Sequence, residues 1–287
     1  MKKIVFLNNF GEPPEKALDR YSIQTPNHSG CWGKIQGVTS PSDADYYIIM
    51  DGCDGEILKK IDWSRVIYFQ REPPSIRPPF MNHDFPQNIF FKGTYEHFYN
   101  VPTWWIKVPF DDLISLPYPK KTKKISTVTS GKTISRPHVR RLQFLKEFSK
   151  EYRDIDIYGR GTQSVAGECW KGELNYNGNC KMRGHLDYEY AIVLENTLIS
   201  NSWSEKPADA ILSWSFPIYS GDSNFEAYFP KDSFYELDVD NYDINEITEF
   251  ISSSPTKSQV ESLHEARNLL LYKWNIWAAI ERIIYAK

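Results

Sequence analysis

The sequence predicts an α/β fold with two Rossmann-like domains that face a central cleft. Two separate sets of short apolar runs, rich in β-branched and aromatic residues, are typical of buried parallel strands. Residues 116–124, with two prolines and four lysines, lie between the sets and predict a linker. At 287 residues, the chain is long enough for each domain to bury a core of its own.

The first set of runs predicts the strands of an N-terminal domain. Its members are residues 3–7, 46–50 and 65–69. A helical turn is expected near residues 15–21. Extended chain is expected again at residues 89–91 and 103–108, after five prolines that force an irregular loop. We therefore assign residues 1–116 to a first domain.

The second set of runs alternates with helical patterns. The predicted strands are residues 125–129, 154–158, 191–194 and 216–219. Residues 137–152 predict an amphipathic helix, and the polar, glycine-rich residues 162–182 predict a loop. We assign residues 117–257 to a second domain. Residues 258–286 predict one long helix, and we expect the final segment, 258–287, to bridge the two domains.

Composition and charge exclude several classes of function. The formal net charge of -3 provides no global positive field that would attract a nucleic-acid backbone. The four cysteines form no C-x-x-C pair and have no histidine at metal-ligand spacing. The lack of a secretory signal and of any apolar run long enough to span a bilayer favours a cytoplasmic protein. The C-terminal helix, with Trp274 and Trp277, offers at most a peripheral membrane contact.

Polar side chains gather between two predicted strands of the second domain. Glu195 and Asn196 directly follow the first of these strands. Pro207 fits the third position of a helix, where no backbone N–H is needed, so Ser204 is the predicted N-cap. Lys206 then lies in the first turn, whose free N–H groups favour an anion. The pattern predicts a site for a phosphorylated ligand at the carboxyl ends of the strands.

The segment from Leu194 to Phe234 carries a series of short motifs in a fixed order. They are Glu195-Asn196-Thr197, Ser204-Glu205-Lys206, Pro217-Ile218-Tyr219, Gly221 and Phe229-Pro230-Lys231-Asp232-Ser233-Phe234. This series resembles the signature of the α-1,3/1,4-fucosyltransferases, glycosyltransferase family 10. Val139-Arg140-Arg141 and Asp156-Ile157-Tyr158-Gly159 are similar to earlier elements of that family. Glu72, just after the strand predicted at residues 65–69, resembles the strand-end acid that serves the family as catalytic base.

The resemblance implies a GT-B fold and a reaction. The expected reaction is an inverting transfer of L-fucose from GDP-fucose to a hydroxyl of an acceptor glycan, α-1,3-fucosyltransferase-like and without an essential metal. Glu72, in an acceptor-binding first domain, would take the proton of the acceptor hydroxyl as the new bond forms. The second domain would bind the GDP-sugar donor.

The resemblance also implies which side chains contact the donor. Lys206 and Arg140 would balance the charge that develops on the leaving GDP. Arg140 and Arg141 are adjacent, and we favour Arg140 for this role. Asn196 and Glu205 suit hydrogen bonding to ribose or fucose hydroxyls, because their amide and carboxylate groups are directional donors and acceptors.

One position departs from the family pattern and leaves alternatives open. Where the family usually has a tyrosine, three residues before the Glu-Lys pair, this chain has Ser202, with Trp203 beside it. We expect Ser202 and Trp203 to share donor binding. The alternatives are a glycosyltransferase that uses another nucleotide sugar and a catalytically silent carbohydrate-binding protein. A metal-dependent enzyme would need an Asp-x-Asp sequence at the donor site, and none of the three such tripeptides follows an apolar strand there.

Overall fold

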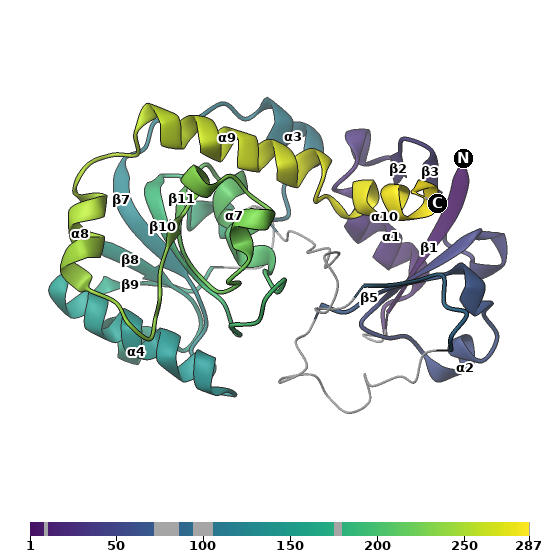
Figure 1. Cartoon of the computed structure of the whole chain (residues 1–287), viewed down its shortest axis with the longest axis horizontal. Coiled ribbons are helices and arrows are strands. Elements are labelled where there is room, and N and C mark those ends of the chain that lie inside the picture. Colours follow the sequence, from purple (N-terminus) through teal and green to yellow (C-terminus); the bar gives the residue numbers. More distant parts are fainter. Residues whose placement is uncertain (9–10, 72–85, 94–105, 175–179, 287) are drawn as a thin grey trace. The chain divides into compact units, whose positions relative to one another are not determined.

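The computed structural model describes residues 1–8, 11–71, 86–93, 106–174 and 180–286, and the chain divides into two units (Figure 1). The first unit comprises Met1–Thr103, Val108–Ser115 and Leu271–Lys287. The second comprises Trp104–Lys107 and Leu116–Leu270. Each has a sheet and a core of its own. In the described ranges, no helix is both long enough and apolar enough to cross a bilayer.

The first unit contains a six-stranded sheet in the order β2-β3-β1-β4-β5-β6 within the described residues. The strands are β1 (Lys2–Asn8), β2 (Cys31–Trp32), β3 (Ile35–Gly37), β4 (Tyr46–Met50), β5 (Val66–Phe69) and β6 (Phe91–Gly93). Only the β2–β3 pair is antiparallel among these pairings. The strands are buried apolar runs, which is the pattern of a parallel sheet covered on both faces.

Side chains of alternating direction place the first sheet between two apolar clusters. Ile4 and Phe6 of β1 pack with α1 (Pro14–Ser22) and α10 (Ile276–Tyr285). Val5 and Leu7 face the other cluster, next to α2 (Gly55–Leu58). The helix α3 (Phe110–Ser115) also belongs to this unit.

The second unit contains a sheet whose pairings are all parallel, in the order β12-β11-β10-β7-β8-β9 among the described strands. The strands are β7 (Lys123–Val128), β8 (Ile155–Tyr158), β9 (Trp170–Gly172), β10 (Tyr188–Leu194), β11 (Phe216–Ser220) and β12 (Tyr235–Glu236). Its helices are α4 (Arg136–Glu151), α5 (Gln163–Ala166), α6 (Cys180–Arg183), α7 (Glu205–Leu212), α8 (Ile244–Ser252) and α9 (Lys257–Tyr272).

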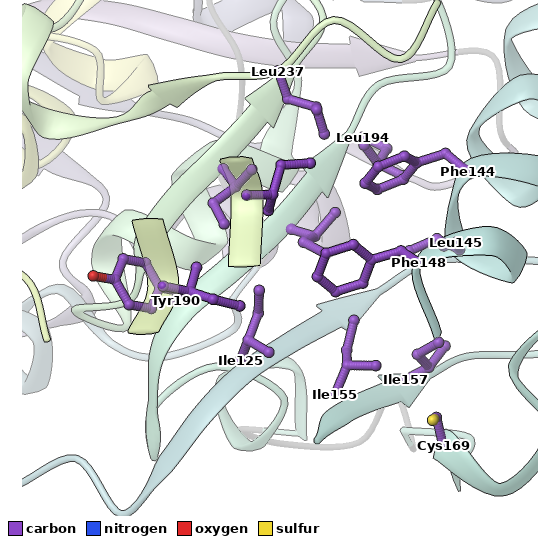
Figure 2. Close-up of a cluster of buried hydrophobic side chains, with 14 of the residues drawn as sticks. Ile125, Phe144, Leu145, Phe148, Ile155, Ile157, Cys169, Tyr190, Leu194 and Leu237 are labelled. Carbon is purple, nitrogen blue, oxygen red and sulfur yellow. The ribbon is translucent and has the colours of Figure 1, made fainter. Parts of the chain in front are cut away.

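A core of aromatic and branched side chains holds α4 and α8 against this sheet. Figure 2 shows Phe144 and Phe148 beside Ile125, Ile155 and Ile157 in this core. Phe144 and Phe148 of α4 are fully buried against isoleucines of β7 and β8, and Ile251 of α8 closes the cluster. Each such side chain contributes about 1.5–3 kcal/mol on burial. Ala191 and Val193 of β10 point to the opposite face and are also buried, so that both faces of this strand are covered.

The strand order creates a switch point between β7 and β10. The chain proceeds from β7 to β8 and β9 on one side of the sheet, and then crosses to β10, β11 and β12 on the other. The loops that follow β7 and β10 therefore diverge at the carboxyl edge, which is where α/β sheets open a crevice for ligands.

The long C-terminal helix predicted for residues 258–286 is wrong, because the structure has two helices, α9 and α10. Asn275 lies between them as the N-cap of α10, and its side chain accepts a hydrogen bond from the Trp277 N–H at 2.8 Å. Its amide also donates to the Gln24 carbonyl oxygen at 2.6 Å. Trp274 and Trp277 are both buried.

The predicted loop at residues 162–182 also differs from the structure, since it contains α5, β9 and the start of α6. The edge strand β9 has only three residues, too few to produce a periodic pattern in the sequence.

Candidate active site

A cavity of about 280 Å³ lies at the carboxyl edge of the second sheet, at the switch point. Val128–Ser130 at the end of β7 and Ile192, Val193 and Asn196 at the end of β10 contribute to its wall. Its cationic lining side chains are Lys132, Arg141, Arg160, Lys181 and Lys206, and its carboxylates are Glu173, Glu205 and Asp209. The excess of positive charge suits an anionic ligand.

Glycines let the loops after β7 and β8 approach each other closely. The Gly131 N–H donates to the Arg160 carbonyl oxygen at 2.8 Å. A Cβ on Gly131 would lie 2.1 Å from the Gly161 oxygen, and one on Gly159 would lie 1.6 Å from the Thr129 oxygen. Gly159 also has a φ of 139°, which L side chains rarely adopt. Only glycine fits these positions, and the paired loops bring Thr129 and Gly159 into the cavity wall.

Arg141 is the guanidinium of α4 that lines the cavity. It is 2 % exposed and donates to the Asn196 Oδ1, and to the Ser130 carbonyl oxygen and Oγ at 2.9 and 3.1 Å. Burial lowers its pKa to about 10, against the opposing effect of Glu195, so the group remains charged at neutral pH. Within the described residues its Nε has no hydrogen-bond partner, which leaves a buried donor for a ligand.

The structure places Arg141 in the cavity wall, whereas we had favoured Arg140. Arg140 forms an ion pair with Asp240 and is not among the described residues that line the cavity. Successive residues of an α-helix point about 100° apart, so one orientation of α4 turns only one of the two side chains inward.

The start of α7 agrees with the prediction made from Pro207. Ser204 is the N-cap, and its side chain accepts a hydrogen bond from the Lys206 N–H. The Lys206 ammonium lies 3.1 Å from Glu195 Oε2 and 3.0 Å from Ser204 Oγ. Burial by itself would lower the pKa of Lys206, but the charges of Glu195 and Glu205 outweigh it and raise that pKa. Lys206 is thus a fixed cation of the cavity wall.

Glu205 lies beside Lys206 and faces a second lysine that the sequence analysis missed. Burial alone would raise the pKa of Glu205, but the charges of Lys206 and Lys181 lower it to about 2. The Lys181 ammonium is 3.9 Å from the Glu205 carboxylate and 2.8 Å from that of Asp209, which is 2 % exposed. Lys181 lies in the region that was predicted to be a loop, and it belongs to no recognisable sequence motif.

His185 is a further lining residue that no sequence motif revealed. It is 4 % exposed, and its Nδ1 has no hydrogen-bond partner among the described residues. Burial, followed by the charges of Lys181 and Lys121, lowers its pKa to about 3. The ring is therefore neutral at physiological pH.

Ser202 and Trp203 do not join the lining side chains in the described part of the cavity. Trp203 is 2 % exposed and packs edge-on against Phe225, Tyr228 and Phe229, with ring centroids 6.2, 5.7 and 5.0 Å away. Ser202 is buried as well. The Trp203 ring, which we expected to contact the donor, belongs to this aromatic cluster. Asn196, Glu205 and Lys206, by contrast, all line the cavity.

Glu72 lies outside the described residues, so its catalytic role stays a prediction. The residue just before it, Arg71, is held by a buried carboxylate. The Arg71 N–H and Nε donate to the Asp51 carboxylate at 2.6 and 2.8 Å, and Asp51 is 1 % exposed.

Solved structures share this two-unit fold. A crystal structure of an α1,3-fucosyltransferase is 17% identical, with 99% of this chain and 90% of that chain covered and a TM-score of 0.50. The DNA-modifying enzyme β-glucosyltransferase is 13% identical, with 99% of each chain covered and a TM-score of 0.56. No curated protein sequence matches this chain. The chain therefore has the GT-B fold that these glycosyltransferases share.

The family follows from the sequence match. Residues 118–261, half of the chain, match the model described as glycosyltransferase family 10 (fucosyltransferase), C-terminal part. The chain belongs to glycosyltransferase family 10, the fucosyltransferases.

Proposed function

We propose that this enzyme transfers L-fucose from GDP-fucose to a hydroxyl of an acceptor glycan with inversion at the anomeric carbon. The second unit would bind the donor, and the first would bind the acceptor and supply the base. The main support is the convergence of Arg141, Asn196 and Lys206 on one cavity at the switch point of the second sheet.

The diphosphate of the donor would bind to the cationic part of this cavity. Arg141 and Lys206 carry full charges, and the first turn of α7 adds backbone N–H groups. Charge develops on the leaving GDP as the glycosidic bond breaks. Fixed cations would stabilise this charge without reorganisation, and such preorganised electrostatic stabilisation is usually the largest single term in catalysis.

Hydroxyl groups of the donor would bind to Asn196 and Glu205. The Asn196 Oδ1 is occupied by Arg141, which leaves its amide N–H groups to donate. Glu205 remains ionised because its pKa is about 2, so its oxygens accept only. Together they offer a donor and an acceptor to ribose or fucose.

Glu72 would act as the general base for direct displacement. Inversion requires the acceptor oxygen to attack as GDP leaves from the opposite side, and the base takes the hydroxyl proton in that step. We also propose that the cationic side chains replace a metal ion at the diphosphate. Turnover that is unchanged in EDTA would support this part, and turnover abolished by EDTA and restored by Mg²⁺ or Mn²⁺ would contradict it.

A thermal-shift panel tests the donor assignment. GDP and GDP-fucose should raise the melting temperature more than GDP-mannose, UDP-sugars or free UDP, because ligands that bind only the native state stabilise it. A preference for a UDP-sugar would support the alternative donor. Binding of glycans with no release of GDP would support the catalytically silent alternative.

Lys206→Ala tests the diphosphate role within the same panel. We expect GDP affinity to fall about 10- to 100-fold, since a buried charge-assisted contact is lost. Unchanged affinity would refute the role of Lys206. Lys257→Ala, which removes an exposed lysine, is the control.

A further inference from the structure

The carboxylate of Glu195 lies beneath the cavity wall and contacts two residues at the start of α7. It is 4 % exposed and is not among the lining residues in the described structure. Its Oε1 accepts the Ser204 N–H at 2.7 Å, and the Ser204 hydroxyl lies 2.8 and 2.7 Å from its two oxygens. Its Oε2 accepts from the Lys206 ammonium at 3.1 Å. One buried side chain therefore holds both the N-cap and the cation of this helix.

These contacts define where the Lys206 charge lies. A lysine has a flexible four-carbon stem, and its ammonium is a point charge without a preferred direction. Here the ammonium contacts Glu195 and Ser204 Oγ, which are themselves hydrogen bonded to each other. The other titratable groups around it are Glu205 on α7, and Arg141 and His138 on α4. Among these groups of the described structure, only Glu195 links the ammonium to the end of a strand.

Gly221 explains how a carboxylate fits at this place. It follows β11, the neighbour of β10, and a Cβ at this position would lie 2.5 Å from Glu195 Cγ and 2.4 Å from Tyr219 Oη. Both distances are too short for a methyl group, and both side chains are buried. The glycine after β11 thus makes room for the glutamate after β10.

We propose that Glu195 is a positioning residue that sets the location and the charge of Lys206 for catalysis, in the space that Gly221 leaves. It acts through Lys206 and does not touch the substrate. The role in turnover rests on the proposed function, whereas the positioning of Lys206 is measurable without any ligand. A pre-placed cation needs no reorganisation when charge develops on the leaving group.

The ligand-free test is competitive labelling of amines with acetic anhydride from pH 7 to 11, read by peptide mass spectrometry. In Glu195→Gln the labelling curve of Lys206 should move to lower pH, because the carboxylate that favours its charged form is gone. Gly221→Ala should move it in the same direction by displacing the carboxylate. A Lys206 curve that overlays that of the unmodified protein in both variants would overturn the proposal.

The matched control is Glu189 at the other end of β10. Its carboxylate also pairs with a lysine and a serine, at 2.5 Å from the Lys124 ammonium and 2.6 Å from Ser254 Oγ. Glu189→Gln should change the labelling of Lys124 and leave that of Lys206 as it is. A change at Lys206 of equal size in this variant would show a general loss of structure and overturn the assignment.

The kinetic test separates positioning from stability. Glu195→Gln should lower kcat about 10- to 100-fold, because a displaced group loses its alignment with the transition state. The KM for the donor should change less than about threefold, and Glu189→Gln should change neither constant. A kcat that is unchanged in Glu195→Gln would overturn the catalytic part. If the unmodified protein shows no GDP-sugar turnover, the proposed function fails, and the labelling result still decides the positioning of Lys206.

Discussion

Both sheets have a buried carboxylate directly after a central strand. In the first unit Asp51 follows β4 and accepts from the backbone N–H and the guanidinium of Arg71. In the second unit Glu195 follows β10 and accepts from the Ser204 N–H and the Lys206 ammonium. Each acid binds one backbone group and one cation of a later segment.

The two cations differ in what lies next to them. Lys206 lines the cavity itself, whereas Arg71 directly precedes Glu72, the proposed base. A strand end is rigid because its backbone is paired on both sides, and a buried ionic contact extends that rigidity to a loop. In each unit a strand end therefore holds a residue at or beside a proposed functional group: Lys206 itself in the second unit, and Arg71, the neighbour of Glu72, in the first.

The largest effect is expected from Glu72→Gln. Turnover should fall about 10²- to 10⁴-fold because the base is lost, while GDP binding is retained. Steady-state kinetics and a GDP titration measure the two quantities. Glu56→Gln, at an exposed glutamate of the same unit, is the control. If Glu72→Gln turns over as fast as the unmodified enzyme, Glu72 is not the base. The contact between Asp51 and Arg71 would then not lie beside a catalytic residue.

Asp51→Asn tests how much the contact between Asp51 and Arg71 stabilises the first unit. The Arg71 guanidinium would keep a hydrogen-bond acceptor but lose its counter-charge. We expect the free energy of unfolding of the first unit to fall by about 2–3 kcal/mol. Urea unfolding followed by hydrogen exchange locates the loss. A loss spread evenly over both units, or no loss, would contradict a local anchor.

Acid should destabilise the second unit before the first. His138 and His185 are buried there, and their pKa values are lowered to about 4 and about 3, mainly by burial. The unfolded chain binds protons at these residues below pH about 6.5, whereas the folded chain does not. The contribution of these histidines to the free energy of unfolding is therefore fully present above that pH. It falls as the pH drops towards 4, by roughly 1–3 kcal/mol per histidine at pH 4.5.

Hydrogen exchange at pH 7 and pH 4.5 measures this difference. His138→Gln with His185→Gln should flatten the pH dependence, and His28→Gln, at an exposed histidine of the first unit, should not. An equal loss of protection in the first unit would contradict the assignment.

The smallest expected effects are those of conservative substitutions at Arg140 and Arg141. Arg141→Lys should weaken GDP binding about 10-fold, because a lysine cannot reproduce the planar contacts to Asn196 and Ser130. Arg140→Lys should stay within about twofold, since its pair with Asp240 is partly exposed. Isothermal titration of both variants is the measurement. A larger loss in Arg140→Lys would favour Arg140 over Arg141 as the contact to GDP.

Much of the second unit was predictable because its signals are local. Strands at residues 125–129 and 216–219, the helix at 137–152 and the N-cap Ser204 all appear in the structure within a few residues of their predicted places. An N-cap and a helical proline act within one turn, so four adjacent residues are enough to specify them.

The predictions for the C-terminal helix and for Trp203 differ from the structure because of contacts with residues distant in the sequence. At the break between α9 and α10, the N-cap Asn275 also donates to Gln24, which is 251 residues away. The burial of Trp203 depends on rings that come from the loop after β11. Neither contact leaves a periodic pattern near the residue concerned. The local sequence therefore predicted one long C-terminal helix and a donor contact for Trp203.

The sequence alone was therefore enough to predict the family and the α/β alternation, and it pointed to the segment that we propose binds the donor, because these depend on short motifs and on apolar periodicity. Tertiary packing decided which side chains line the cavity and which lie behind its wall. The orientation of α4 directs Arg141 into the cavity wall, and the space beside Gly221 accommodates Glu195. Trp203 packs in the aromatic cluster and does not line the described cavity. Side-chain direction depends on what packs behind each element, and that is set by residues distant in the sequence.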